Sequence, residues 1–345
     1  MRIAVVGLGY WGPNLVRNLL QLPEVQQVVM VDRDPARLAS ATRKFPTARA
    51  VAELDPLLER GEVDAVILAT PLSTHYEMGK RVLLAGCHLL VEKPFSETSA
   101  QAEELILLAG ERGRVLMVDH TFLYTGAVRK IRDLLKDGRI GRMLYFDSVR
   151  VNLGLFQHDT NVVWDLAPHD LSILDHLVDA TPSAVQAVGS RHYYGYEDMA
   201  YLTVFYPDEL MAHFHVNWIA PVKVRRILIG GDRQMIVFDD MDPSEKIKVY
   251  DKGVELSRPE DIWQTLVSYR TGDMWAPKID MTEALAVMLR DFIACIQAGG
   301  RPLADARSAL NVVCMLEAAE MSLRQGGRRV ELSELPRNQE DKHKE

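Results

Sequence analysis

Apolar residues in the first third of the chain fall into short runs separated by segments with helical periodicity. In those segments they recur every three or four positions, as on one face of an amphipathic helix. Strands that alternate with helices in this way form a parallel sheet with helices on both faces. The pattern predicts a doubly wound α/β fold whose ligand binds at the carboxyl ends of the strands. The strand-like runs are Ile3–Val6, Val28–Asp32, Ala65–Ala69, His88–Glu92 and Val115–Val118.

Capping residues suggest where some of the helices begin and end. Ser73 is expected to cap a helix that Gly86 ends, and Ser96 to cap the next helix. A further amphipathic helix is predicted over Gly126–Lys136, with its apolar stripe on one side.

The pattern changes after this helix, because strands separated by turn residues replace the alternation. One helical island interrupts them at Val163–Val178, and two helices are expected over Thr282–Ala298 and from Asp305 to Gly326. Few crossovers and many turns favour a largely antiparallel sheet with one face packed and one accessible. The predicted strands are Met143–Val151, Ala184–Ser190, Met199–Phe205, Met211–Trp218, Arg226–Ile229, Met235–Asp239 and Lys246–Tyr250.

Composition narrows the possible partners and the compartment. The 345 residues carry a formal net charge of −8, and the absence of a basic tract argues against nucleic acid or an anionic membrane as the main partner. Three widely spaced cysteines argue against a disulfide framework. No leader pattern and no run of roughly 18 apolar residues is present, so a cytoplasmic location is expected.

The first strand runs into three glycines with the spacing G-x-G-x-x-G. Gly7 suits the tight turn, Gly9 allows a pyrophosphate to approach the backbone, and Gly12 lets the following helix pack closely. Asp32 ends the second strand about 20 residues on, where a carboxylate accepts the ribose 2′-hydroxyl of NAD. Arg33 follows it and would tolerate NADP. The alternative is an ordinary strand–helix turn with an incidental acid.

The fourth predicted strand ends in Glu92-Lys93-Pro94. A lysine at the carboxyl end of such a strand can hydrogen-bond a substrate hydroxyl and stabilise negative charge on its oxygen. A solvated Glu–Lys pair at an exposed strand end is the alternative.

The chain resembles the glucose-fructose oxidoreductase, inositol dehydrogenase and MocA family. Four segments carry the resemblance in order: GLGYWG from Gly7, ATPLSTH from Ala69, VEKP from Val91 and WDLAPHD from Trp164. The resemblance implies a Rossmann domain over 1–121 and a substrate-binding and oligomerising α/β domain over 122–335. The residues themselves indicate a charged tail over 336–345. The closing helices, 282–326, are allowed to pack back on the first domain.

The resemblance also implies NAD(P)-dependent redox chemistry on sugars or cyclitols. By this resemblance Lys93, Asp165 and His169 are the catalytic residues and contact the substrate. The residues expected to border the cofactor are Gly7, Gly9, Tyr10, Trp11, Gly12, Asp32, Arg33, Thr70, Pro71, His75, Glu92, Lys93 and Pro94.

Asp165 and His169 lie four positions apart in the helical island, on one face of a helix. Histidine titrates near neutral pH, which suits proton abstraction from a sugar hydroxyl. A helix-face ion pair, a core histidine and half of a metal site are the alternatives. No further ligand cluster is evident, so no metal is predicted. His213 and His215 share a strand face and either line a pocket or pack on the sheet.

The segments GYWGPN and WDLAPHDLS resemble the branch of the family that acts on nucleotide-linked sugars. That branch oxidises C3 of a UDP-N-acetylhexosamine or its uronic acid. The alternatives are a dehydrogenase of a free sugar or cyclitol such as inositol, and a non-catalytic NAD(P)-binding regulator. Many members carry aspartate three residues after the histidine, where this chain has Ser172, and Asp170 directly follows the histidine.

A UDP-sugar substrate needs cations for its diphosphate and hydrogen-bonding groups for its sugar. Asn152 and Asn161 are candidates for the sugar hydroxyls. An open sheet face also favours association, so a homodimer or homotetramer is expected. The candidate cations are Arg150, Lys223, Arg225 and Arg226.

Overall fold

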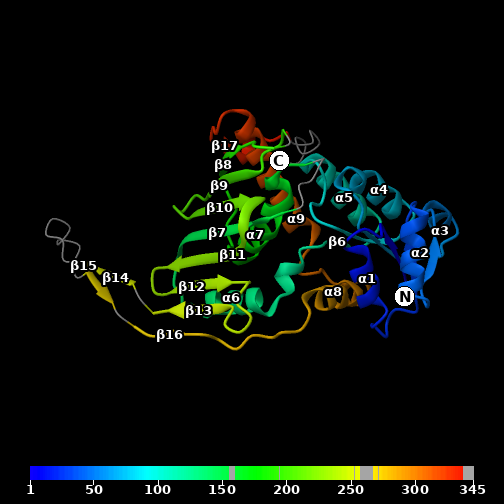
Figure 1. Ribbon diagram of the computed structural model, residues 1–345, viewed down its shortest axis with the longest axis horizontal. Helices are drawn as coiled ribbons and strands as arrows, with labels where there is room; N and C mark the ends of the chain where they lie inside the picture. The colour runs from blue at the N-terminus through cyan, green and yellow to red at the C-terminus, as the bar shows by residue number, and fades with distance from the viewer. Residues whose placement is uncertain (155–159, 194, 252, 257–266, 271, 337–345) are drawn as a thin grey trace. The chain divides into compact units, whose positions relative to one another are not determined.

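The structure is a computed structural model that describes residues 1–154, 160–193, 195–251, 253–256, 267–270 and 272–336. It divides into two compact units (Figure 1). Met1–Tyr124 and Thr282–Cys314 belong to the first, and Thr125–Met281 and Met315–Leu335 to the second. The predicted charged tail lies outside the described residues except at Pro336.

The first unit contains a six-stranded parallel sheet in the order β3-β2-β1-β4-β5-β6, which confirms the predicted doubly wound fold. Its middle strands are buried on both faces, as their continuous apolar runs require. The strands are β1 (Arg2–Val6), β2 (Gln27–Val31), β3 (Arg49–Val51), β4 (Ala65–Leu68), β5 (His88–Val91) and β6 (Leu116–Val118).

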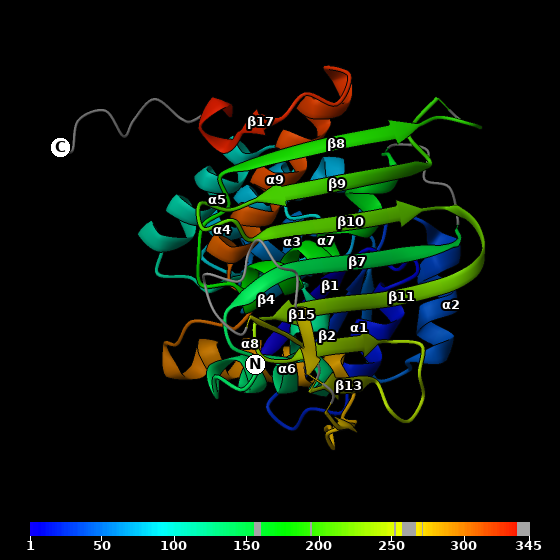
Figure 2. The ribbon, with the colours of Figure 1, turned by 90° about the vertical axis from the view of Figure 1, so that its left-hand side faces the viewer.

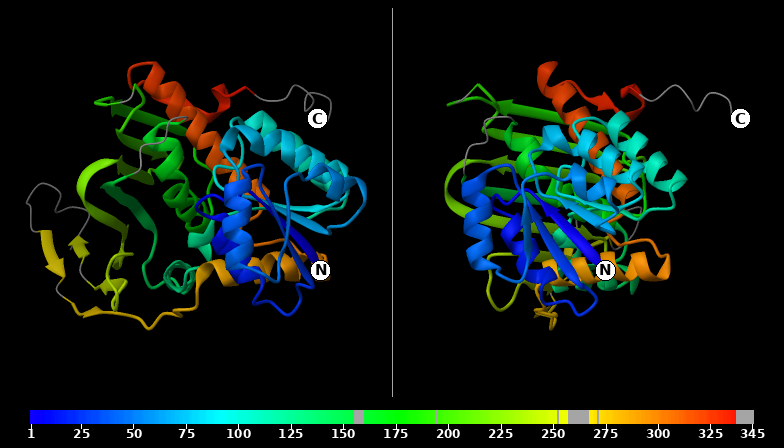
Figure 3. Two further views of the ribbon diagram at one scale, coloured as in Figure 1. Left: turned by 45° about the vertical axis from the view of Figure 1, so that its right-hand side comes forward. Right: turned by 90° about the vertical axis from the view of Figure 1, so that its right-hand side faces the viewer.

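The strand order reverses between β1 and β4. Because right-handed crossovers run in opposite directions from these two strands, their helices cover opposite faces of the sheet (Figure 3). On one face α1 packs with α8, and on the other α4 packs with α5. The helices are α1 (Gly12–Leu19), α2 (Pro35–Lys44), α3 (Asp55–Glu59), α4 (His75–Leu84), α5 (Ser99–Glu111) and α8 (Ala284–Ala298), with 3₁₀ turns η1 (Leu72–Thr74) and η2 (Thr121–Tyr124).

Two predicted caps are wrong. Ser73 lies inside η1, and α4 follows with Thr74 at its cap position. Ser96 donates its hydroxyl to the Thr98 carbonyl, and Thr98 caps α5 by accepting from the Gln101 amide at 3.2 Å. The cap residue of α4 is Thr74, one position after Ser73, and the cap residue of α5 is Thr98, two positions after Ser96.

The second unit contains a nine-stranded sheet in the order β16-β13-β12-β11-β7-β10-β9-β8-β17. Among the described strand pairings of this second sheet, only β7 with β10 is parallel. The predicted mostly antiparallel sheet is therefore confirmed. The strands are β7 (Met143–Leu153), β8 (Ala184–Ser190), β9 (Met199–Phe205), β10 (Met211–Asn217), β11 (Ile219–Gly231), β12 (Met235–Asp239), β13 (Ile247–Tyr250), β16 (Met274–Trp275) and β17 (Val330–Glu331).

Helix α7 (Val162–Leu177) packs on one face of this sheet, against β7, β9 and β10. Phe146 and Phe214 face the helix and are fully buried, with ring centroids 5.7 Å apart. Figure 2 looks onto the opposite face, where the strands run across the view. The remaining elements are α6 (Gly126–Lys136), α9 (Ala306–Arg324), η4 (Leu332–Glu334) and a hairpin of β14 (Gly253–Leu256) and β15 (Val267–Arg270).

None of the described helices is both long enough and apolar enough to pass through a lipid bilayer.

Candidate active site

The three glycines after β1 meet different surroundings. A Cβ on Gly7, whose φ is 94°, would lie 2.4 Å from the Ala69 carbonyl oxygen, and a Cβ on Gly12 would lie 2.0 Å from the Gly7 carbonyl oxygen. A Cβ on Gly9 would meet nothing within 4 Å. Gly7 and Gly12 are therefore required by the fold of the loop itself. Gly9 leaves open space against the backbone, as a bound pyrophosphate requires.

Helix α1 begins beside this open space. Its cap residue is Trp11, whose side chain makes no capping hydrogen bond, and Pro13 occupies the first turn. Tyr10 and Trp11 are exposed and pack edge to face, with centroids 5.2 Å apart. Without a side-chain cap, the positive end of the helix is available to an anionic ligand.

Asp32 follows the neighbouring strand β2 and contacts the glycine loop. Its Oδ2 accepts the Leu8 amide at 2.7 Å and its Oδ1 accepts the Asp34 amide at 2.9 Å. Each carboxylate oxygen has a second lone pair, so the carboxylate can also accept a ribose hydroxyl. Arg33 is exposed next to it. Arg37, which the sequence did not suggest, places its guanidinium 3.9 Å from Asp32. The glycine loop and Asp32 together fit the pyrophosphate and ribose of NAD.

His75 joins two loops at the carboxyl edge of the same sheet. Its Nε2 lies 2.9 Å from the Thr70 carbonyl oxygen, and its Nδ1 lies 2.9 Å from the Pro94 carbonyl oxygen. Burial lowers the pKa of His75, and a neutral imidazole donates to only one of the two carbonyls. The Thr74 hydroxyl donates to the Pro71 carbonyl at 2.7 Å. His75 thus ties the loop after β4 to the loop after β5.

Glu92, Lys93 and Pro94 follow β5 in that order. The peptide bond between Lys93 and Pro94 is cis, and Lys93 is partly exposed at the strand end. Glu92 is buried beside Asp119, which follows β6. The glycine loop, the Thr70–His75 segment and Lys93 therefore follow adjacent strands β1, β4 and β5 at one edge of the sheet. Asp119 was missed in the sequence because its pairing with Glu92 depends on strand register.

In the second unit, Asp165 and His169 lie on one face of α7. Asp165 Oδ2 accepts the indole N–H of Trp218 at 3.0 Å, which fixes the carboxylate on the helix. His169 is partly exposed, and its carbonyl accepts the Ser172 hydroxyl at 2.7 Å. Pro168 lies within the helix just before His169.

Asn161 caps α7. Its Oδ1 accepts the Val163 and Trp164 amides at 3.1 and 3.2 Å, and its amide donates to Glu320 at 2.8 Å. The side chain is buried. The structure gives Asn161 this capping role, and its contact with a substrate stays a prediction.

Asp170 anchors α7 to the sheet. It forms a two-bond ion pair with Arg150, at 2.9 and 2.6 Å, and accepts the Ser148 hydroxyl at 2.8 Å. All three residues are buried. The acid after the histidine therefore holds the helix, and with it the neighbouring His169, against β7. Arg150 holds that anchor from the interior of the unit.

Arg225 lies directly opposite Arg150 across β11 and β7. Its side chain is 31% exposed and approaches Asp240 at 3.4 Å, while Asp240 also binds Lys246 at 3.0 Å. Burial, and then repulsion from Arg150, lower the pKa of the Arg225 guanidinium. An anionic group beside this arginine pair would be stabilised.

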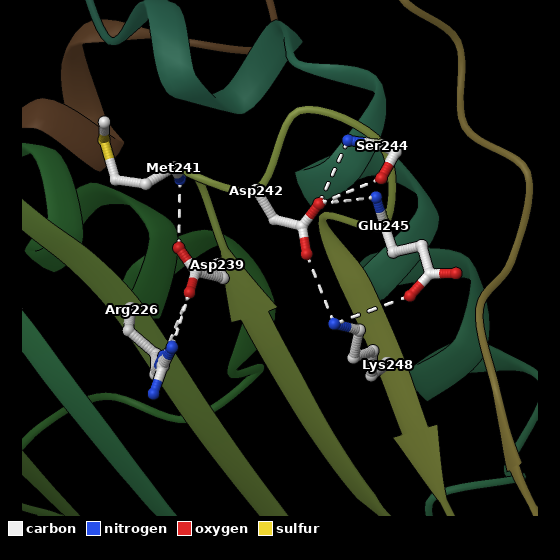
Figure 4. Close-up of polar contacts among 7 residues, drawn as sticks. All are labelled: Arg226, Asp239, Met241, Asp242, Ser244, Glu245 and Lys248. Carbon is white, nitrogen blue, oxygen red and sulfur yellow. Dashed lines mark hydrogen bonds and ion pairs between the residues drawn. The ribbon is translucent and has the colours of Figure 1, made fainter.

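Arg226 points to the other face of β11. It is exposed and pairs with Asp239 at 2.7 Å, beside the turn in which Asp242 accepts the Ser244 and Glu245 amides (Figure 4). Lys223 is exposed on the same strand. Asn152 is two positions after Arg150 in β7 and by strand alternation shares its face.

His213 and His215 lie on the sheet face opposite α7. They alternate with Phe214, which packs towards the helix, and their rings stack on Tyr201 with centroids 6.0 and 4.5 Å away. Within this unit, they are thus separated by the sheet from Asp165 and His169. Across the part of the chain that is described, no group of three or more His, Cys, Asp or Glu side chains is arranged to hold a metal ion.

Comparisons with known proteins match both units. Residues 1–120 match the family model described as "Oxidoreductase family, NAD-binding Rossmann fold", and residues 128–237 match the "GFO/IDH/MocA C-terminal domain". UDP-N-acetylglucosamine 3-dehydrogenase from Acidithiobacillus ferrooxidans is 30% identical over 232 residues, which is 66% of this chain and 71% of that protein.

Two solved structures share the fold. The Acidithiobacillus ferrooxidans UDP-N-acetylglucosamine 3-dehydrogenase GnnA superposes with a TM-score of 0.81 at 24% identity, covering 94% of this chain and 98% of that one. GenD2 from gentamicin A biosynthesis, in complex with NAD, gives a TM-score of 0.80 at 23% identity, covering 96% of both chains.

Proposed function

Because the chain belongs to the glucose-fructose oxidoreductase, inositol dehydrogenase and MocA family of NAD-binding oxidoreductases, we propose that it oxidises a secondary hydroxyl of a nucleotide-linked sugar. The proposed position is C3 of a UDP-N-acetylhexosamine or its uronic acid. The observation that carries the proposal is that Lys93 lies at the same carboxyl edge of the parallel sheet as the glycine loop and Asp32. The UDP-N-acetylglucosamine 3-dehydrogenase relative supports the substrate class.

In the proposed reaction, an alcohol becomes a ketone. When bound, NAD supplies the acceptor for the hydride that leaves the sugar carbon. The Lys93 ammonium donates a hydrogen bond to the sugar oxygen and stabilises the negative charge that develops there. His169 takes the hydroxyl proton, and the electron pair of the broken O–H bond forms the carbonyl. Asp165, fixed by Trp218, orients a neighbouring sugar hydroxyl or the imidazole.

The arginine pair on β7 and β11 supports an anionic substrate. Arg150 pairs with Asp170, and Arg225 pairs with Asp240, which also binds Lys246. Asp170 is bound tightly to Arg150, whereas Arg225 is the more exposed arginine. We assign Arg225 to the diphosphate or the uronate carboxylate, which guanidinium groups bind well.

A substrate panel tests the proposed function. Absorbance at 340 nm is followed with NAD or NADP and with UDP-N-acetylglucosamine, its uronic acid, free N-acetylglucosamine or inositol. NADH formation with a UDP-sugar is expected, with a higher kcat/KM for NAD than for NADP because Asp32 accepts the ribose hydroxyl and repels a phosphate. Turnover of only inositol or a free sugar contradicts the nucleotide-linked substrate. Cofactor binding without turnover of any sugar would favour a regulator.

Arg225→Met is the matched variant for this panel, with Arg226→Met as its control on the opposite face of β11. Loss of one hydrogen bond to a charged group costs roughly 1.5–3 kcal/mol, so KM for the UDP-sugar is expected to rise about tenfold or more. The same KM in Arg225→Met and Arg226→Met would remove Arg225 from the proposed site.

The open face of the second sheet supports a homodimer or homotetramer. Val188, Met211 and Tyr201 are 48%, 49% and 37% exposed on this face, and Val188 pairs with Tyr201 across β8 and β9, so the face presents apolar side chains that a second copy could cover. We expect light scattering to give a multiple of the 38.9 kDa chain mass. Met211→Lys should lower that mass, and a wild-type protein that scatters as a monomer would contradict the proposal.

A further inference from the structure

Trp218 lies between the end of β10 and the start of β11, and it is 2% exposed. Its amide donates to the Asp198 carbonyl at 2.9 Å, and its carbonyl accepts the Gly154 amide at 2.9 Å. A Cβ on Gly154 would lie 2.9 Å from Cδ1 of the indole, so glycine lets the chain that leaves β7 pass close to the ring. Trp218 is therefore held at both polar groups of its backbone, and its ring is closely packed.

The indole N–H is the polar group of this side chain, and it donates to Asp165 Oδ2 at 3.0 Å. Because an indole N–H can only donate, the oxygen that it meets must accept, and the bond favours the ionised form of the carboxylate. A hydrogen bond to an ionised group is about twice as strong as one between neutral groups. A carboxylate that turned away from the ring would lose this bond, so Trp218 fixes one oxygen of Asp165.

The turn between β8 and β9, described over 191–193 and 195–198, joins Trp218 to the helix that carries Asp165. Glu197 accepts the amide of Val162, the first residue of α7, at 2.9 Å. The next residue of the turn, Asp198, accepts the Trp218 amide. Asp165 lies three positions after Val162 in the first turn of α7. Two consecutive carbonyl groups thus set where the indole stands relative to the helix.

The side chain of Asp198 fixes the shape of the β8–β9 turn. It is 1% exposed. Its Oδ2 accepts the amides of His192 and Tyr193 at 2.8 and 3.2 Å, and its Oδ1 lies 2.6 Å from Nδ1 of His192. A buried carboxylate is stable only when it is hydrogen-bonded, so a conformation of the turn that broke these bonds would be costly. The turn therefore keeps its two carbonyl groups in place.

We propose that Trp218 is a positioning residue for the oxidation of the sugar, which holds one carboxylate oxygen of Asp165 while the β8–β9 turn holds Trp218. The inference deepens the proposed function and rests on it for the use of Asp165. Trp218 is assigned no contact with the substrate. A carboxylate that is already oriented needs no rearrangement before it binds a sugar hydroxyl or the imidazole, which is how a supporting residue contributes to a catalytic site.

A double-mutant cycle distinguishes positioning from a general loss of structure. Trp218→Phe keeps an aromatic ring and removes the N–H, and Asp165→Asn keeps the shape of the carboxylate and removes its charge. Trp218→Phe alone is expected to lower kcat/KM for the sugar about tenfold or more, since a hydrogen bond to a charged group is lost. In the Asp165→Asn background the same change should cost less than about twofold, because the group that Trp218 positions is already impaired.

Trp275→Phe is the matched control for this cycle. Trp275 is partly exposed on β16, which lies three strands from β11 in the sheet, and its replacement should have the same small effect in both backgrounds. Equal losses from Trp218→Phe with and without the Asp165 carboxylate would mean that Trp218 acts only on the stability of the unit. That result, or a wild-type kcat/KM in Trp218→Phe, would overturn the proposal.

The indole signals test the hydrogen bond in protein without substrate. The chain has five tryptophans, and the signal lost in Trp218→Phe identifies its N–H in a proton–nitrogen correlation spectrum. Asp165→Asn should move this signal upfield more than any other indole signal, because the acceptor has lost its charge. Asp198→Asn, which weakens the turn, should move it in the same direction.

A Trp218 signal that stays in place in Asp165→Asn would exclude the bond as the means of positioning. One that stays in place in Asp198→Asn would remove the β8–β9 turn from the proposal. If no sugar is oxidised, the proposed function fails, and the spectrum still decides whether Trp218 holds Asp165.

Discussion

Replacing Lys93 by methionine is expected to lower kcat for sugar oxidation about 100- to 1,000-fold. This is the usual cost of removing one donor that stabilises a developing negative charge on oxygen. Methionine keeps much of the side-chain length and removes the ammonium. Steady-state rates at 340 nm measure the loss, and fluorescence titration with NADH shows whether the first unit still binds its cofactor.

Lys80→Met is the control for this variant. Lys80 lies on α4 in the same unit, and its ammonium pairs with Glu104 away from the strand ends. Its loss should leave kcat unchanged. His169→Asn completes the comparison, because loss of a general base costs about 10²- to 10⁴-fold. His213→Asn on the other face of the sheet should cost little. Near-normal kcat in both Lys93→Met and His169→Asn would refute the mechanism.

The sequence predicted most of the strands because their apolar runs are continuous and end at glycine or acidic residues. It missed β3, since Arg49–Val51 spans three residues with no fully buried side chain. It also placed the start of β11 at Arg226, whereas the strand begins at Ile219 and passes through Pro221. A proline normally argues against a strand, and here β11 has a register shift between Ile219 and Val224.

The candidate site was predictable where local spacing defines a function. The glycine loop, Asp32 and Lys93 each follow a strand, so their place at the carboxyl edge followed from topology. Arg150 shows the limit of such reasoning. Strand alternation puts Arg150 on the same face of β7 as Phe146 and Ser148. Only the packing of α7 on the sheet shows that this face is interior and that Arg150 pairs with Asp170 there. Asp119 is a similar case, because its partner Glu92 lies 27 positions away.

Substituting Gly12 or Gly9 in the glycine loop is expected to lower NAD affinity for two different physical reasons. Gly12→Ala would place a Cβ 2.0 Å from the Gly7 carbonyl oxygen, which is part of the backbone and cannot rotate away. The start of α1 must shift, so we expect a loss of roughly 1–3 kcal/mol in the free energy of unfolding together with a severe loss of NAD affinity. Urea unfolding and NADH titration measure the two effects.

Gly9→Ala is the matched variant, because its Cβ would meet nothing within 4 Å. The substitution should therefore leave the free energy of unfolding of the cofactor-free protein almost unchanged. NAD affinity should still fall at least about tenfold, since the methyl group takes the space through which a pyrophosphate reaches the backbone. Stability lost only at Gly12 and affinity lost at both positions is the expected pattern. Because the added methyl group touches no protein atom, it can act on NAD affinity only by contacting the ligand. An unchanged NAD affinity in Gly9→Ala would therefore mean that the pyrophosphate binds elsewhere.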